Sequence, residues 1–240
     1  DGAVLLVDSV AGIEVGTELV WGYCDTFRLP RMVVISKMDR ENASFERALA
    51  EVRSLSPDVA FVPVQLPWGE KQDLKGVIDL FKMKARPADG KGEEEIPADL
   101  VPAAQEARVA LVEAAAEGDD NLLEKYLDGQ ELTAEEVARG AQRAVRSGRL
   151  IPVCIAAGTA GIGAIPLLER IIELLPSPAD APPAIAQGKG GVEELSATDA
   201  GPLAVYVWKT TADPFVGKLT YMRVYSGTLN SDSRVWNQGK

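Results

Sequence analysis

The sequence predicts an α/β fold with an inserted α+β subdomain, followed by the start of a β-barrel domain. Three short runs, at residues 3–7, 32–35 and 152–155, are apolar on both faces, as parallel strands covered by helices on both sides are. Helical patterns separate these runs. Beyond residue 203 the apolar period changes to two, which is typical of antiparallel strands. The 240 residues give room for one or two domains.

The helices of the α/β layer follow from spacing and from prolines. Residues 18–27 fit one helix, which ends before Pro30. Phe45, Leu49 and Val52 form an amphipathic stripe. A last helix at residues 164–175 has a broad apolar face, and Pro176 stops it. Alternating strands and helices predict right-handed crossovers and a parallel sheet.

A long segment separates the second strand from the third, although a βαβ unit needs only about 30 residues. We therefore expect an inserted subdomain at residues 58–148, between residues 1–57 and 149–176 of the α/β domain. Strand-like stretches at 59–66 and 76–83 come first, and Gly90-Lys91-Gly92 marks a turn. Helices are expected at 101–117, 121–127 and 134–146, the last one behind a capping box of Thr133 and Glu136.

Residues 177–202 are rich in Pro, Gly and Ala, which predicts a linker. Residues 203–240 are expected to open a β-barrel domain, with strands at 203–209, 219–225 and 234–236. The chain begins directly with a buried strand and without an initiator Met, so we expect it to be part of a longer protein.

Composition restricts the chemistry. The chain has no histidine, which excludes Ser-His-Asp and Cys-His catalysis and His-ligated zinc within it. No apolar stretch is long enough to span a bilayer, and no signal peptide pattern is present. Cys24 and Cys154 are interpreted as two buried, reduced thiols of a cytoplasmic protein.

The net charge is −11, and it is concentrated in one segment. Residues 89–137 hold 15 acidic and 3 basic residues. This segment repels phosphate backbones, so strong direct nucleic-acid binding is not expected of it. An acidic face suits a basic protein partner, or it serves only as a solvated face that aids solubility.

The main candidate site is Ser36-Lys37-Met38-Asp39, at the end of the second apolar run. Ligands of parallel α/β sheets bind at the carboxyl ends of strands. A carboxylate is acceptor-only, so Asp39 could accept both N–H groups of a guanine edge, whereas adenine offers the opposite pattern. The alternative is an ordinary strand-to-helix turn with Asp39 near a helix start.

A second loop, Ala156-Ala157-Gly158-Thr159, follows the third run. A guanine site also needs a backbone N–H directed at O6, and Ala157 or Gly158 could supply it. Taken alone, this loop is a glycine-containing turn. The residues themselves therefore offer Lys37, Asp39 and an N–H of Ala157 or Gly158 as candidate contacts of a guanine base, with Ser36 at the start of the first loop.

Several motifs in the right order closely resemble the elongation factor G family of translational GTPases. They cover nearly the whole chain and lie at residues 1–14, 36–39, 65–69, 76–80, 123–127, 174–178 and 213–219. The resemblance implies the back half of a P-loop GTPase-type parallel sheet and a protein that acts with GTP on the ribosome in translocation. It also implies GTP or GDP as the ligand and a contact of the inserted subdomain with the ribosomal stalk protein. The cofactor-binding residues that it implies are Ser36, Lys37, Asp39, Ala157, Gly158 and Thr159.

The chain departs from the family in both loops, because Ser36 stands where the family has Asn and Ala157 where it has Ser. These changes point to an elongation factor G-like paralogue. No phosphate-binding Gly-x-x-x-x-Gly-Lys-Ser/Thr pattern occurs in the chain. We therefore expect no catalytic residue and no metal ligand here, an inactive fragment, and phosphate and Mg²⁺ ligands upstream of Asp1 in a GTPase parent. The alternative function is a ribosome-binding relative with weakened nucleotide binding, acting as a protein-interaction module.

Overall fold

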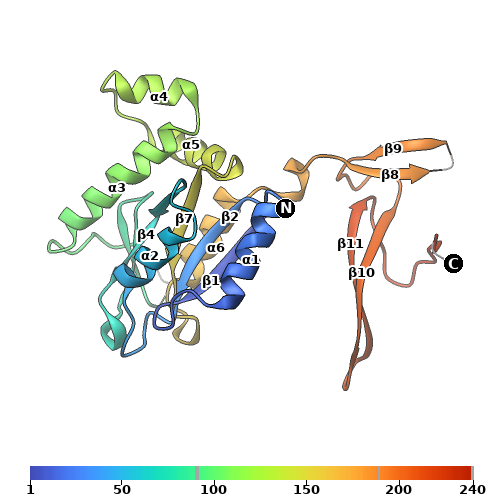
Figure 1. The fold of residues 1–240 in the computed structure, drawn as a ribbon, viewed down its shortest axis with the longest axis horizontal. Helices are drawn as coiled ribbons and strands as arrows, with labels where there is room; N and C mark the ends of the chain where they lie inside the picture. The colour runs from blue at the N-terminus through green and yellow to red at the C-terminus, as the bar shows by residue number, and fades with distance from the viewer. Residues whose placement is uncertain (90–91, 189, 239–240) are drawn as a thin grey trace. The chain divides into compact units, whose positions relative to one another are not determined.

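The computed structural model describes residues 1–89, 92–188 and 190–238 (Figure 1). The chain divides into two compact units, Asp1–Pro176 and Ser177–Lys240. Within the described ranges, no helix has the length and apolar character needed to cross a membrane. The predicted turn at Gly90-Lys91-Gly92 falls on residues 90 and 91, outside the described residues.

The first unit is built on a four-stranded parallel sheet in the order β1-β2-β7-β3, which confirms the predicted fold class. Its strands are β1 (Ala3–Asp8), β2 (Arg31–Ser36), β3 (Ala60–Pro63) and β7 (Leu150–Ile155). The three strands predicted for it are present. The fourth, β3, lies beside β7.

Two hydrophobic layers cover this sheet (Figure 1). On one face, Val33, Ile35 and Val153 pack with α1 (Val15–Thr26) and α2 (Phe45–Ser54). On the other face, Met32, Val34 and Cys154 pack with helices of the inserted segment and with α6 (Ala164–Leu174). The inserted segment therefore supplies a core layer of the α/β unit.

The prediction of one strand at residues 59–66 is wrong, because the chain changes sheets at Val64. The N–H of Val64 donates to the Val153 carbonyl at 2.9 Å, and its carbonyl accepts from Leu80 N–H at 3.1 Å. Before it, β3 runs parallel to β7; after it, β4 (Gln65–Trp68) runs antiparallel to β5 (Gly76–Asp79). Pro63 and Pro67 lack the N–H groups that a central strand would use, and this favours the break.

The insert combines a three-stranded antiparallel sheet with three helices. The sheet has the order β4-β5-β6, with β5 at Gly76–Asp79 and β6 at Lys84–Pro87. The strand expected at 76–83 thus ends at Asp79. The helices are α3 (Val101–Ala116), α4 (Asp120–Leu127) and α5 (Ala134–Arg146). The predicted capping box is confirmed, since Thr133 and Glu136 each bind the other's backbone N–H.

The second unit contains two antiparallel hairpins. One joins β8 (Ala184–Gly188) to β9 (Gly191–Leu195), and it lies within residues 177–202, the segment predicted as a linker. The other joins β10 (Ala204–Asp213) to β11 (Gly217–Ser226). The strand expected at 234–236 is absent, because no described residue pairs with it and a strand needs a hydrogen-bonded neighbour.

Candidate nucleotide-base site

The two predicted loops meet at the carboxyl edge of the parallel sheet. β1 and β2 end together, with Asp8 opposite Ser36, and β7 ends beside β2 with Ile155 opposite Ile35. The N–H of Ala156 donates to the Ile35 carbonyl at 2.9 Å, and the Ala156 carbonyl accepts from Met38 N–H at 3.3 Å. Loops 36–39 and 156–159 are therefore joined by hydrogen bonds.

Lys37 has a strained backbone and a fixed side chain. Its φ is +56°, a left-handed conformation that costs a non-glycine residue of order 1 kcal/mol. The Lys37 ammonium forms an ion pair with Asp8. The backbone carbonyl of Lys37 accepts a hydrogen bond from the buried Ser9 hydroxyl at 2.9 Å. The hydrogen bond from Lys37 lowers the pKa of Asp8. Strain that is held in this way is common at ligand sites.

Ser36 contacts the neighbouring strand. Its hydroxyl donates to the Val7 carbonyl at 3.1 Å, which ties the ends of β1 and β2 together. The Ser36 side chain therefore stabilises the start of the loop through β1, and nothing in the described structure places it against a ligand.

Asp39 is half-buried, and among the described residues its carboxylate has no hydrogen-bond or ion-pair partner. Met38 beside it is 3% exposed and anchors the loop in the core. Asp39 does not cap α2, because the Ser44 hydroxyl caps that helix and accepts from Arg47 N–H. Residues 38 and 39 do form a turn between β2 and α2, as the alternative of an ordinary strand-to-helix turn expects. Asp39 is thus an acceptor held by rigid neighbours and available to a ligand.

In the second loop, the structure distinguishes Ala157 from Gly158. Ala157 is buried, and its N–H donates to the Ile162 carbonyl at 3.0 Å. Gly158 begins a short 3₁₀ turn, Gly158–Ala160, and its N–H has no partner among the described residues. Gly158 and Thr159 are both exposed. Of the two candidates, therefore, only Gly158 has a backbone N–H that is available to donate to a ligand.

Sequence reasoning missed the support of the loop after β1. The Arg47 guanidinium on α2 donates to the carbonyls of Ser9 at 3.0 Å and Val10 at 3.1 Å. Ser9 in turn holds Lys37. Asp8 could have been noted from its place at a strand end, but Arg47 gave no signal because it lies 38 positions from Ser9 in sequence.

Among the described residues, the carboxyl edge of the sheet has no cluster of metal-ligating side chains. Over residues 1–89, 92–188 and 190–238, no three Cys, Asp or Glu side chains gather so that they could hold a metal ion.

The fold and its ligand edge define an α/β domain built to bind a ligand at the carboxyl ends of parallel strands. Residues 1–177 match the family described as the elongation factor Tu GTP binding domain. The chain belongs to this family of translational GTPases.

A solved structure also resembles the chain. A crystal structure of a protein from Thermus thermophilus aligns with a TM-score of 0.75 and 36% sequence identity. The alignment covers 95% of this chain and 32% of that protein, so the chain spans about a third of the length of this relative. The matched family is one of GTP-binding domains.

Proposed function

We propose that this chain is part of a GTP-binding translation factor of the elongation factor G type, in which it recognises the guanine base. Asp39 accepts the N1–H and N2–H groups, Gly158 N–H donates to O6, and the Lys37 stem lies along the base. The observation that carries this proposal is the hydrogen bond between Met38 and Ala156, because it joins an available carboxylate to an available N–H at one edge.

The proposal assigns phosphate and Mg²⁺ binding, and with them GTP hydrolysis, to other parts of the protein. An exposed apolar surface around β1 supports this division. β1 is an edge strand with Leu6 67% exposed, and apolar side chains on both flanking helices are also exposed. They are Val15, Leu19, Val20 and Tyr23 on α1 and Ile165, Leu168 and Ile172 on α6. Such a patch beside an open strand edge favours coverage by further elements of the sheet.

The test is a titration of the full-length protein with fluorescent GDP, followed by competition with unlabelled GTP and ADP. We expect GTP to displace the probe and ADP to fail at the same concentrations, because adenine presents the inverted pattern to Asp39 and Gly158. Equal displacement by ADP would contradict guanine recognition.

The second candidate is a ribosome-binding relative with weakened nucleotide binding. Ser36 and Ala157 favour it, since the Ser36 hydroxyl is used on Val7 and Ala157 has no side-chain donor. The supports from Ser9 and Asp8 to Lys37 argue for a formed loop instead. Micromolar or tighter GDP affinity would argue against this candidate.

We also propose the ribosome as the site of action and the ribosomal stalk protein as a partner of the insert. The acidic residues of segment 89–137 include exposed Glu106 and Glu113 on α3 and exposed Glu117 directly after it. This charge suits a basic protein surface better than a nucleic-acid backbone. Calorimetric titration of the full-length protein with stalk protein tests the contact, and the absence of binding at low salt would remove it.

A further inference from the structure

Two polar side chains of the insert are completely buried behind the second base loop. Gln65 on β4 and Asp79 on β5 are both 0% exposed and lie opposite each other in the antiparallel pair. Burying such groups is costly unless they are fully hydrogen-bonded. Their contacts lead to the two ends of the loop that carries Gly158.

Gln65 holds the start of the loop. Its side-chain Oε1 accepts from Ile155 N–H at 3.2 Å, and Ile155 is the last residue of β7. The chain has already left β3 at Val64, so the Gln65 side chain takes the place of the missing strand carbonyl. The next residue, Ala156, bonds to both Ile35 and Met38. A shift of Ile155 would therefore displace first the loop that carries Gly158, which follows it directly, whereas loop 36–39 keeps the contacts of Lys37 with Asp8 and Ser9.

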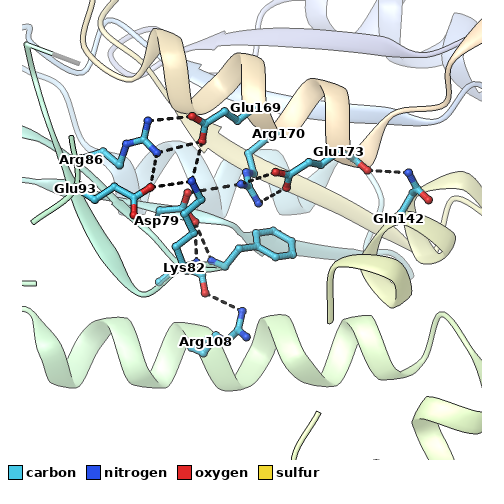
Figure 2. Close-up of polar contacts among 11 residues, drawn as sticks. Asp79, Lys82, Arg86, Glu93, Arg108, Gln142, Glu169, Arg170 and Glu173 are labelled. Atoms are coloured by element: carbon cyan, nitrogen blue, oxygen red, sulfur yellow. Dashed lines mark hydrogen bonds and ion pairs between the residues drawn. The ribbon is translucent and has the colours of Figure 1, made fainter. Parts of the chain in front are cut away.

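Asp79 holds the helix that follows the loop. Its Oδ1 accepts from the backbone N–H of Phe81 at 2.9 Å, and its Oδ2 lies 3.7 Å from Arg170 Nη2 on α6. Arg170 is 1% exposed, and its guanidinium lies 4.6 Å from the centre of the Phe81 ring. Figure 2 shows the Arg170 guanidinium of α6 between Asp79 and Glu173, with which it also forms an ion pair at 2.7 Å, and Arg108 of α3 on the other side of Asp79.

A second ion pair fixes α6 beside the first. The two Nη atoms of Arg86 on β6 bind the two carboxylate oxygens of Glu169 at 3.1 and 3.0 Å (Figure 2). Although burial opposes ionisation of Glu169, its hydrogen bond with Arg86 lowers the pKa of the carboxyl group. Such a fork-to-fork pair defines orientation as well as distance.

The end of the loop also packs closely on β5. Gly163 has a φ of +78°, and a Cβ there would lie 2.6 Å from the Ile155 carbonyl oxygen and 3.4 Å from Val77 Cγ1. Glycine is required by both the conformation and the space. The segment from Ile155 to α6 is thus held at its start, at its end and from behind by the insert.

We propose that Gln65 and the Asp79–Arg170 pair are positioning residues, through which the insert sets the place of the O6-reading N–H of Gly158. This inference rests on the proposed function. Stability alone does not account for the burial of Gln65 and Asp79, because Gln65 Nε2 and Asp79 Oδ2 have no hydrogen bond among the described residues. Apolar replacements of buried charged groups are often neutral or stabilising, so these polar groups are better explained by position.

The experiment compares three nucleotides on the full-length protein. GDP and 6-thio-GDP differ at position 6, where sulfur accepts a hydrogen bond poorly, so their affinity ratio reports on Gly158. GDP and IDP differ in the 2-amino group, so their ratio reports on Asp39. The variants are Gln65→Met, which removes the acceptor for Ile155, and Asp79→Asn, which keeps an oxygen for Phe81 but removes the charge facing Arg170.

In both variants we expect the ratio of GDP to 6-thio-GDP affinity to fall by about threefold to tenfold, the range that one misplaced hydrogen bond gives. We expect the ratio of GDP to IDP affinity to stay within about twofold, because Asp39 keeps its own supports. Val137→Ala is the control: it opens a cavity in the buried insert core away from the loop and should lower the unfolding temperature with both ratios unchanged.

An unchanged GDP to 6-thio-GDP ratio in Asp79→Asn or Gln65→Met would overturn the inference, and so would an equal loss in both ratios. If Gln65→Met does not fold, the isosteric Asp79→Asn decides. If the unaltered protein does not prefer GDP to either analogue, the proposed function fails instead.

Discussion

The backbone N–H of Met38 donates to the carbonyl oxygen of Ala156 at 3.3 Å. Met38 lies between Lys37 and Asp39, and Ala156 lies two residues before Gly158. This one hydrogen bond therefore makes the carboxylate and the N–H of the proposed base site parts of a single rigid edge. Substitutions of Asp39 and Gly158 are therefore expected to change base binding and not the fold.

Gly158 offers a matched pair of substitutions. A Cβ at Gly158 meets nothing within 4 Å, so Gly158→Ala should bind GDP like the unaltered protein. Gly158→Pro in addition replaces the N–H by the ring Cδ, and the first position of a 3₁₀ turn accepts proline. We expect GDP affinity to fall about tenfold in the proline variant, as for one lost hydrogen bond. Equal affinities for the two variants in a GDP titration would exclude Gly158 from the site.

The Asp8–Lys37 ion pair predicts a pH dependence of stability. The Lys37 hydrogen bond lowers the pKa of Asp8 in the folded protein. The ionised carboxylate therefore stabilises the fold above about pH 4, and this contribution is lost as the pH falls through the lowered folded value. Lys37 is largely exposed, so the pair should contribute less than about 1 kcal/mol.

The measurement compares unfolding of the unaltered protein and Asp8→Asn between pH 7 and pH 3. The stability difference should be constant near neutral pH and shrink on acidification. The control is Glu41→Gln, which neutralises an exposed acidic residue in the segment between β2 and α2. A difference that grows as the pH falls would contradict the assignment.

Both cysteines should be unreactive in the folded protein. Burial raises the pKa of Cys154 to about 12 and also raises the pKa of Cys24, so neither forms the reactive thiolate at pH 8. Peptide mapping after iodoacetamide treatment should find both unmodified until guanidinium is added. Thr159→Cys, at an exposed loop position, should react in the native state. Rapid modification of native Cys154 would show that the insert does not cover the sheet as described.

The features that sequence predicted depend on local signals. Apolar runs at residues 3–7, 32–35 and 152–155 predicted parallel strands because only buried strands are apolar on both faces. Thr133 and Glu136 predicted the start of α5 because a capping box is a local motif. The meeting of loops 36–39 and 156–159 followed because the carboxyl ends of parallel strands share one edge.

The features that sequence did not predict depend on distant partners. The break at Val64 needs both Val153 and Leu80, and the choice of Gly158 over Ala157 depends on the Ile162 carbonyl. The roles of Gln65 and Arg47 depend on partners 90 and 38 positions away. The β8–β9 hairpin was missed because Pro, Gly and Ala suit both linkers and short hairpins.

Asp39→Asn tests the central claim most directly. An amide in place of the carboxylate presents one donor and one acceptor, so it matches the edge of xanthine, which has a carbonyl at position 2, better than that of guanine. Competition of GDP and XDP for the full-length protein should show a preference for GDP in the unaltered protein and for XDP in Asp39→Asn. An unchanged preference for GDP in the variant would contradict guanine recognition by Asp39.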